Sequence, residues 1–243
     1  MSFTVIIPAR YSAQRLPGKP LLDICGKPMV QHTYERALDS NAKQVCIATD
    51  DRRIKEVVED FGGKAFMTAN THLSGTDRIQ EVTNILDLKD DELVVNVQAD
   101  EPLIPSCVIN QVANNLAEKI EVGISTLCEV ISSRGEMEDP NIVKVVLNAK
   151  GNALYFSRSA IPHQSNAGIS CCFRHIGIYA YRVNVLNQFV KLLPSELESI
   201  EKLEQLRALT NGIPVHVEMS SHQVPAGVDT KKDLETVRSI LAG

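Results

Sequence analysis

Residues 3–28 read FTVIIPARYSAQRLPGKPLLDICGKP, and this stretch decides the fold. Thr4–Ile7 is a short β-branched run, which is typical of a strand buried on both faces of a sheet. Pro8 is expected to end the run, and a long irregular loop follows it. The stretch therefore predicts a buried strand that leads directly into a loop.

That loop is rich in positive charge. It carries Arg10, Arg15 and Lys19 and no acidic residue, and two prolines and a glycine at positions 17–20 keep it out of a helix. Charge-assisted hydrogen bonds to phosphate are among the strongest that side chains make, so the loop suits a polyphosphate. It is not a P-loop, because Ala13 and Pro20 stand where that motif needs Gly and Ser or Thr. The alternative is a solvated basic loop.

Composition narrows the class of protein. The 243 residues allow one large domain or two small ones, and 44% hydrophobic with 23% charged residues is ordinary for a globular protein. A net charge of -5 argues against general nucleic-acid binding, which needs a basic face. A local basic cluster on an acidic chain instead indicates a small anionic ligand.

The sequence also bears on the compartment. No apolar run approaches the ~18 residues of a membrane span, and the first residues lead into a strand rather than a signal peptide. The six cysteines form no C-x-x-C, and Cys46 and Cys128 fall inside expected strands, as reduced core cysteines do. We expect a cytoplasmic protein with no membrane partner.

Strands and helices alternate through the first half of the chain. Apolar runs and helical spacing predict strands at 4–7, 45–48, 65–67, 93–97 and 122–127, with helices between them at about 29–38, 54–61, 75–86 and 105–119. Ser74 and Asp77 form a capping box at the start of the third helix. Repeated βα units predict an α/β fold, with a mostly parallel, Rossmann-like sheet covered by helices on both faces.

The pattern changes after Pro140. Strands are expected at 142–147 and 153–157, joined by a hairpin turn, and again at 175–181. We expect residues of about 140–182 to form a small β-rich insertion over one edge of the main sheet. An acidic helix at about 195–210, a strand at 215–219 and a helix capped by Thr230 and Asp233 complete a single domain, residues 1–243.

Ligands of open parallel sheets bind beyond the carboxyl ends of the strands. This rule places Asp100, after the strand at 93–97, and Asp229, before the last helix, opposite the basic loop. Carboxylates beside phosphates need a cation between them, and Mg²⁺ suits one or two carboxylates plus phosphate oxygens. The alternatives are a turn residue for Asp100 and a helix N-cap for Asp229.

Several further motifs carry a resemblance that spans the chain. Besides IPARYSAQRLPGKPL at the start, they are SGTDR at 74–78, VNVQADEP at 95–102, YFSR at 155–158, HIGIYAYR at 175–182, LEQLR at 203–207 and GVDT at 227–230. With these motifs the chain resembles the sugar-acid cytidylyltransferases, in particular the group that acts on 3-deoxy-D-manno-octulosonate (Kdo). The resemblance implies the nucleotide-diphosphosugar transferase fold and a homodimer.

The resemblance also implies roles for individual residues. Those that would bind the nucleotide and its phosphates are Arg10, Arg15, Lys19, Ser74, Gly75 and Arg78. Those that would bind Mg²⁺ are Asp100 and Asp229, which with Arg10 and Lys19 would form the catalytic group. Those that would line the sugar-acid pocket are Gln98, Arg158, His175, Tyr179, Glu204 and Gln205, with Arg158 meeting the carboxylate. Alternatively, Arg158 caps a strand end, His175 packs against the sheet, and Glu204 and Gln205 form a solvated helical turn.

The implied activity is transfer of CMP from CTP to Kdo, with release of pyrophosphate, for lipopolysaccharide synthesis. The anomeric hydroxyl would attack the α-phosphorus directly, so no protein nucleophile is needed. The alternatives are another sugar acid such as 8-amino-Kdo, another nucleotide, or a non-catalytic nucleotide-binding regulator. Two positions depart from the family pattern: Ala99 replaces a usual Gly, which would strain a turn of positive φ, and segment 163–172 is short.

Overall fold

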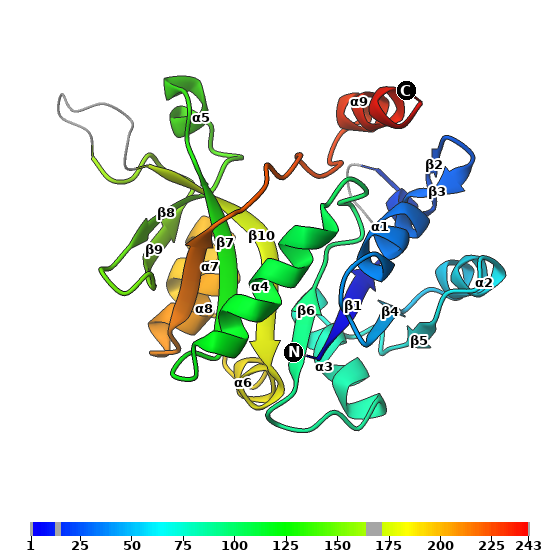
Figure 1. Cartoon of the computed structure of the whole chain (residues 1–243), viewed down its shortest axis with the longest axis horizontal. Helices are drawn as coiled ribbons and strands as arrows, with labels where there is room; N and C mark the ends of the chain where they lie inside the picture. The colour runs from blue at the N-terminus through cyan, green and yellow to red at the C-terminus, as the bar shows by residue number, and fades with distance from the viewer. Residues whose placement is uncertain (1, 13–15, 164–171, 243) are drawn as a thin grey trace.

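The computed structural model describes residues 2–12, 16–163 and 172–242 (Figure 1). A mixed sheet lies at its centre, with strand order β11-β7-β10-β6-β1-β4-β5. These strands are β1 (Phe3–Ala9), β4 (Gln44–Thr49), β5 (Ala65–Met67), β6 (Leu93–Asn96), β7 (Ile124–Val130), β10 (Phe173–Arg182) and β11 (Val215–Met219). A hairpin of β8 (Lys144–Leu147) and β9 (Ala153–Ser157) attaches to β10.

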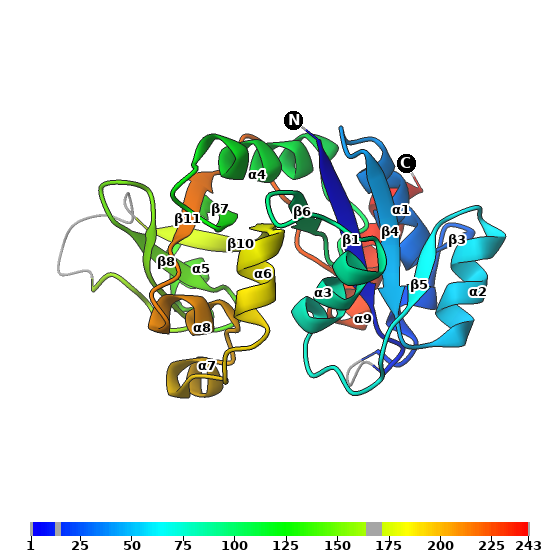
Figure 2. The same cartoon turned by 90° about the horizontal axis from the view of Figure 1, so that it is seen from below.

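Helices cover both faces of the sheet, as predicted (Figure 2). Alternate residues of a strand point to opposite faces, so neighbouring residues of β1 pack in different cores. Val5 packs in the core under α1 (Met29–Leu38), α2 (Arg52–Asp60) and α4 (Ser106–Glu118). Ile6 packs in the core under α3 (Gly75–Ile85), α6 (Val183–Phe189) and α8 (Gln205–Thr210). The other helices are η1 (Lys19–Leu21), α5 (Arg134–Glu138), α7 (Glu196–Glu201) and α9 (Lys231–Leu241). No helix of the described residues is long and apolar enough to cross a membrane.

Several local expectations are confirmed. The strands at 65–67, 153–157 and 215–219 have the predicted bounds, and Ser74–Asp77 and Thr230–Asp233 both form capping boxes. The expectation that Pro8 ends the first strand is wrong, since β1 continues to Ala9. Of the residues of β1, only Phe3–Ile6 pair with β6. Pro8 therefore lies where that side of β1 has no ladder partner and a missing N–H is tolerated.

The expected position of the β-rich insertion is wrong for its last strand. β10 does not lie over an edge but runs antiparallel between β6 and β7, in the middle of the sheet. Only the β8–β9 hairpin is peripheral. β10 can occupy this place because both of its faces are apolar: Ile178 packs in one core and Tyr181 in the other. Strand order depends on such long-range packing, which a local pattern does not encode.

The single helix expected at about 195–210 is two helices. Lys202 adopts a left-handed conformation, with φ of 55°, which ends α7. Beyond the break, Leu203 and Leu206 are buried, whereas Ile200 of α7 is 69% exposed. The break lets α8 begin a new direction, so that Glu204 and Gln205 stand at its start. This redirection places both side chains on the wall of a large cavity.

A bulge in β10 shapes the same region. The pairing of β10 with β7 shifts register between Ile176 and Tyr179, so the extra backbone at Gly177 has no regular ladder partner. The carbonyl of Gly177 instead accepts a hydrogen bond from Gln98 Nε2, at 3.0 Å. A Cβ atom at position 177 would lie 2.7 Å from that nitrogen, so glycine is required for this close approach.

Candidate active site

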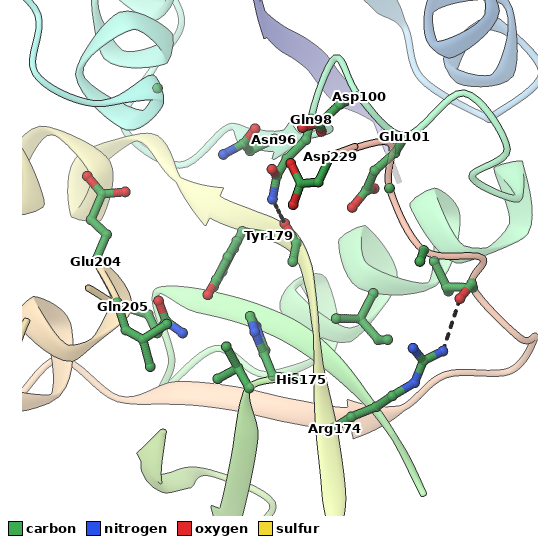
Figure 3. A pocket seen from close by; sticks show the side chains of 18 of the residues that line it. Asn96, Gln98, Asp100, Glu101, Arg174, His175, Tyr179, Glu204, Gln205 and Asp229 are labelled. Carbon is green, nitrogen blue, oxygen red and sulfur yellow. Dashed lines mark hydrogen bonds between the residues drawn. The ribbon is translucent and has the colours of Figure 1, made fainter. Parts of the chain in front are cut away.

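The carboxyl ends of β1 and β6 open onto a cavity of about 850 Å³ (Figure 3). A smaller pocket of about 220 Å³ adjoins it at the basic loop, and the two share lining residues that include Gly75 and Asp100. Together they collect most of the residues predicted from sequence: Arg10, Lys19, Gly75, Gln98, Asp100, His175, Tyr179, Glu204, Gln205 and Asp229. Arg15 lies outside the described residues.

Lys19 joins the two predicted metal ligands. Its Nζ lies 2.5 Å from Asp100 Oδ2 and 3.0 Å from Asp229 Oδ1, across a separation of 210 residues. Burial acts to lower the pKa of Lys19, but the two carboxylates outweigh it and raise that pKa. The ammonium group therefore stays charged and holds the carboxylates together.

A crossing segment, residues 220–230, brings Asp229 to this point. It runs from β11 to α9 across the carboxyl ends of the central strands (Figure 1). The N–H of Val228 donates to the Asp100 carbonyl at 2.8 Å, and Val224 bonds through its backbone to both Glu129 and Arg174. Because Glu129 and Arg174 come from β7 and β10, the sheet itself fixes the segment.

Arg10 gives the smaller pocket an unsatisfied donor. Its Nη2 atom is buried and has no hydrogen-bond partner among the described residues. Buried polar groups are normally paired, and a guanidinium forms its strongest hydrogen bonds with carboxylates and phosphates. With Lys19 on the same pocket, Arg10 makes this end suited to an anion.

The opposite end of the cavity presents an acceptor. Glu204 accepts a hydrogen bond from Thr76 of α3 at 2.6 Å. Its second oxygen is buried, forms no hydrogen bond with the described residues, and lies 3.8 Å from Nη2 of Arg207. Burial raises the pKa of Glu204, although the Thr76 hydrogen bond and the charge of Arg207 act in the other direction. Figure 3 shows Glu204 on the side of the cavity away from Asp100 and Asp229.

Aromatic side chains form the wall between the two ends. The His175 ring lies 5.0 Å from Phe156 and 5.3 Å from Tyr179, measured between centroids. Burial lowers the pKa of His175 to about 3 and raises the pKa of Tyr179, so both side chains are neutral near pH 7. This wall can form hydrogen bonds without adding charge.

Two of the residues predicted to bind the nucleotide, Ser74 and Arg78, have other contacts. Ser74 caps α3, and its Oγ accepts from the N–H of Asp77 at 3.1 Å. Arg78 was expected beside the nucleotide, but its side chain is fully buried and donates to Asp50 at 2.8 Å and to Thr68. The described structure does not bring the Arg78 guanidinium to either pocket lining.

Arg158 was expected to meet the sugar carboxylate, but the cavity lining does not include it. Its Nε donates to the Glu201 carbonyl at 2.8 Å, at the end of α7, and Nη1 donates to the Pro140 carbonyl at 3.0 Å. A cation is favourable at a helix C-terminus, which explains why the side chain turns there. The alternative reading, a capping role, fits this geometry better.

Sequence reasoning also missed residues that line the cavity. They include Asn96, Glu101, Arg174 and Thr76. Asn96 has a signal in the sequence: it precedes Gln98 by two positions, the spacing that places side chains on one face of a strand. Its Oδ1 is buried without a hydrogen-bond partner among the described residues, so a ligand would satisfy it.

Comparison with known proteins identifies the family. The family model described as cytidylyltransferase matches residues 4–220. The chain belongs to this family. It is 54% identical to a 3-deoxy-manno-octulosonate cytidylyltransferase of Hahella chejuensis, over 99% of this chain and 98% of that one. It is 53% identical to an enzyme of the same name from Vibrio vulnificus, over 100% and 99% of the two chains.

Solved structures agree with this assignment. A CMP:2-keto-3-deoxy-manno-octonic acid synthetase complexed with CTP superposes with a TM-score of 0.92 at 45% identity, covering 99% of this chain and 98% of that one. A cytidylyltransferase of Leptospira borgpetersenii superposes with a TM-score of 0.62 at 16% identity, over 99% and 86%, which shows a shared fold. The cytidylyltransferase fold expected from the motifs is therefore confirmed.

The two departures from the family pattern have different outcomes. Among the described non-glycine residues, positive φ occurs at Cys25, Asp87 and Lys202, so Ala99 causes no strain of this kind. The short segment 163–172 lies outside the described residues except for its ends. Alanine therefore fits the turn before Asp100 in this cytidylyltransferase without backbone strain.

The first prediction concerns Glu101, next to Asp100 in this cytidylyltransferase. Its Oε2 is buried and forms no hydrogen bond within the described part of the chain, and burial, followed by the charge of Asp100, raises its pKa to about 8. Between pH 4.5 and about pH 8 the Glu101 carboxyl is ionised in the unfolded chain but still protonated in the folded chain. Folding stability from this group therefore falls as pH rises toward 8, by up to about 1.4 kcal/mol per pH unit.

Glu101→Gln removes this titration. We expect the stability of the variant, relative to wild type, to increase from pH 5 to pH 8 and then to level off. Urea unfolding in the presence of EDTA at each pH measures the difference. Two stability curves that stay parallel across this range would contradict the prediction.

Proposed function

We propose that this protein transfers CMP from CTP to Kdo and releases pyrophosphate. The observation that carries the proposal is the convergence of Asp100 and Asp229 on Lys19 beside the unsatisfied Arg10, at one end of a cavity with a polar far end. Relatives of about half-identical sequence over their whole length bear this activity in their names. The cavity has room for a nucleotide and a sugar acid side by side.

Asp100 and Asp229 would hold Mg²⁺ in this reaction. Among the described residues no cluster of three or more His, Cys, Asp or Glu side chains forms a complete metal cage. Two carboxylates beside a phosphate pocket fit Mg²⁺, which binds through one or two carboxylates and takes its other ligands from phosphates and water. The bound ion would supply charge neutralisation at the α-phosphate and favour the ionised form of the attacking hydroxyl.

Arg10 and Lys19 would stabilise the leaving group. Phosphoryl transfer needs little covalent help from a protein, so positioning and charge stabilisation supply most of the catalysis. Lys19 is already charged and fixed by the two carboxylates, and Arg10 has an unused donor. Both groups are therefore preorganised for the charge that develops on pyrophosphate.

The rest of the cavity would orient the sugar acid. Gln98 is fixed by the Gly177 carbonyl, and Glu204 and Gln205 begin α8 at the far end. Amides, imidazole and carboxylate together offer both donors and acceptors to a row of hydroxyls. The buried Glu204 oxygen that forms no hydrogen bond with the described residues would also pair with an ammonium group, which makes an 8-amino analogue of Kdo the second candidate.

The proposal also covers the oligomeric state and the cellular location of the enzyme. We propose a homodimer, supported by exposed apolar side chains such as Leu154 and Ile200 on the neighbouring elements β9 and α7. We also propose a cytoplasmic enzyme that contributes to lipopolysaccharide synthesis, where Kdo is used. Sedimentation of the purified chain tests the dimer.

Pyrophosphate release tests the reaction directly. The assay uses CTP or UTP as donor and Kdo, 8-amino-Kdo or N-acetylneuraminate as acceptor. We expect kcat/KM to be highest for CTP with Kdo and low for N-acetylneuraminate, because buried polar groups left unpaired penalise the wrong sugar. If kcat/KM is higher for 8-amino-Kdo than for Kdo, the amino sugar is the preferred substrate. If no pair of donor and acceptor releases pyrophosphate, the proposal is wrong.

The second prediction concerns the metal ligands. Asp100→Asn and Asp229→Asn should each abolish turnover while the fold survives, because an amide cannot supply the charge that Mg²⁺ requires. EDTA should reproduce the loss in wild type, and added Mg²⁺ should reverse it. Asp60→Asn, at an exposed position of α2, is the matched control and should keep full activity. Normal turnover in either folded site variant would remove that residue from the metal site.

The third prediction concerns Lys19. Lys19→Ala should lower kcat by about 10²–10³, the scale for losing one preorganised electrostatic contact. The effect should fall on kcat rather than on KM for CTP, because charge develops on the leaving group in the transition state. Lys55→Ala on the surface of α2 is the control. A raised KM for CTP with unchanged kcat would mean that Lys19 only binds the substrate.

The fourth prediction uses the glycine in the β10 bulge. A methyl group in Gly177→Ala would displace the Gln98 amide, which is the flexible end of its side chain, so stability should change little. The KM for Kdo should rise about as much as in Gln98→Ala. The double variant should be no worse than either single variant, since both remove the same contact. Additive effects on KM would show that Gly177 acts independently of Gln98.

A further inference from the structure

Thr126 of β7 is fully buried, and it does not line the cavity. Its Oγ1 nevertheless lies 3.0 Å from Nε2 of His175, which does line it. The same oxygen lies 3.0 Å from the carbonyl of Ile176 and 2.7 Å from that of Ile178. These two carbonyls flank the β10 bulge, where the regular ladder is interrupted. One hydroxyl therefore contacts three polar groups.

The chemistry of these groups fixes the position of one proton. A threonine hydroxyl has a single hydrogen to donate, and carbonyl oxygens only accept. The hydroxyl must therefore donate to a carbonyl, and Ile178 lies nearer than Ile176. It can then only accept from His175, so Nε2 must carry a hydrogen. The network assigns the Nε2–H form to His175.

The other ring nitrogen, Nδ1, is available to a ligand. Burial keeps His175 neutral, so Nδ1 carries a lone pair rather than a second hydrogen. Among the described residues no group forms a hydrogen bond to Nδ1. Figure 3 shows the imidazole directed into the cavity, and its contacts with Phe156 and Tyr179 restrict rotation of the ring.

We propose that Thr126 is a positioning residue that holds His175 in the Nε2–H tautomer, so that Nδ1 accepts a hydrogen bond from a hydroxyl of the sugar substrate. The substrate part of this inference rests on the proposed function. It adds a rule of specificity: the ligand atom at Nδ1 must be a donor. A hydroxyl or an ammonium group satisfies it, whereas a carboxylate or carbonyl oxygen meets a lone pair and is disfavoured.

The tautomer is testable without substrate. NMR of the wild-type chain labelled with ¹⁵N-histidine distinguishes a protonated from an unprotonated ring nitrogen, and His175→Gln identifies the resonances of His175. We expect a protonated Nε2 and an unprotonated Nδ1 from pH 5 to pH 8. A hydrogen on Nδ1 in this range, on the neutral or the charged ring, would overturn the proposal.

The role of Thr126 needs a variant that removes only the hydroxyl. Thr126→Val is close to isosteric and should allow the Nδ1–H form to appear in the ¹⁵N spectrum. It should raise the KM for Kdo about 10-fold, the scale of one hydrogen bond, and leave the KM for CTP unchanged. Thr126→Ser restores the hydroxyl and should bring both the spectrum and the KM back to within about threefold of wild type.

Thr4→Val provides the matched control. Thr4 is equally buried in β1, but its hydroxyl has no hydrogen-bond partner among the described residues, so the same substitution should leave the KM for Kdo and the His175 spectrum unchanged. If Thr126→Val keeps the wild-type tautomer and KM, or if Thr126→Ser behaves like Thr126→Val, the positioning role is wrong. If wild type does not use Kdo, the proposed function fails, while the ¹⁵N spectrum still decides the tautomer.

Discussion

The ammonium group of Lys19 is the contact on which the site depends. It bridges Asp100 at the end of β6 and Asp229 at the start of α9, and without a cation between them the two carboxylates would repel each other. The bridge also ties the basic loop after β1 to the loop after β6 and to the segment before α9. A polyphosphate with Mg²⁺ would meet the same three groups, so the ligand-free contacts already bring the proposed metal ligands together.

The bulge in β10 sets the geometry of the sugar end. The carbonyls of Gly177 and Ile178 lie in the irregular part of the strand, and they accept hydrogen bonds from the side chains of Gln98 and Thr126. Leaving a buried polar group unpaired costs about 1–3 kcal/mol, so the fully buried Thr126 side chain is held firmly, whereas the Gln98 amide is exposed and its contact is weaker. The irregularity of the strand therefore fixes the orientation of residues that face the ligand.

Local signals in the sequence predicted much of the fold. The β-branched run at Thr4–Ile7, the helical spacings and the two capping boxes depend on neighbours a few positions away, and the structure confirms them. The break at Lys202 and the central place of β10 were not predicted, because each depends on burial against distant elements. For the same reason Arg158 was assigned to the sugar pocket, although its partner Glu201 lies 43 residues away along the chain.

The sequence by itself determined the chemical inventory: a basic loop after the first strand, one acid after the strand at 93–97, another before the last helix, and motifs that resemble the cytidylyltransferases. It determined them because residue type and short spacing are written directly in the chain. Only the tertiary structure decided which of these groups meet. It brought Lys19, Asp100 and Asp229 together, buried Arg78 on Asp50, and placed Thr126 against His175. Contacts across tens or hundreds of residues arise from packing of the whole sheet, which no local pattern specifies.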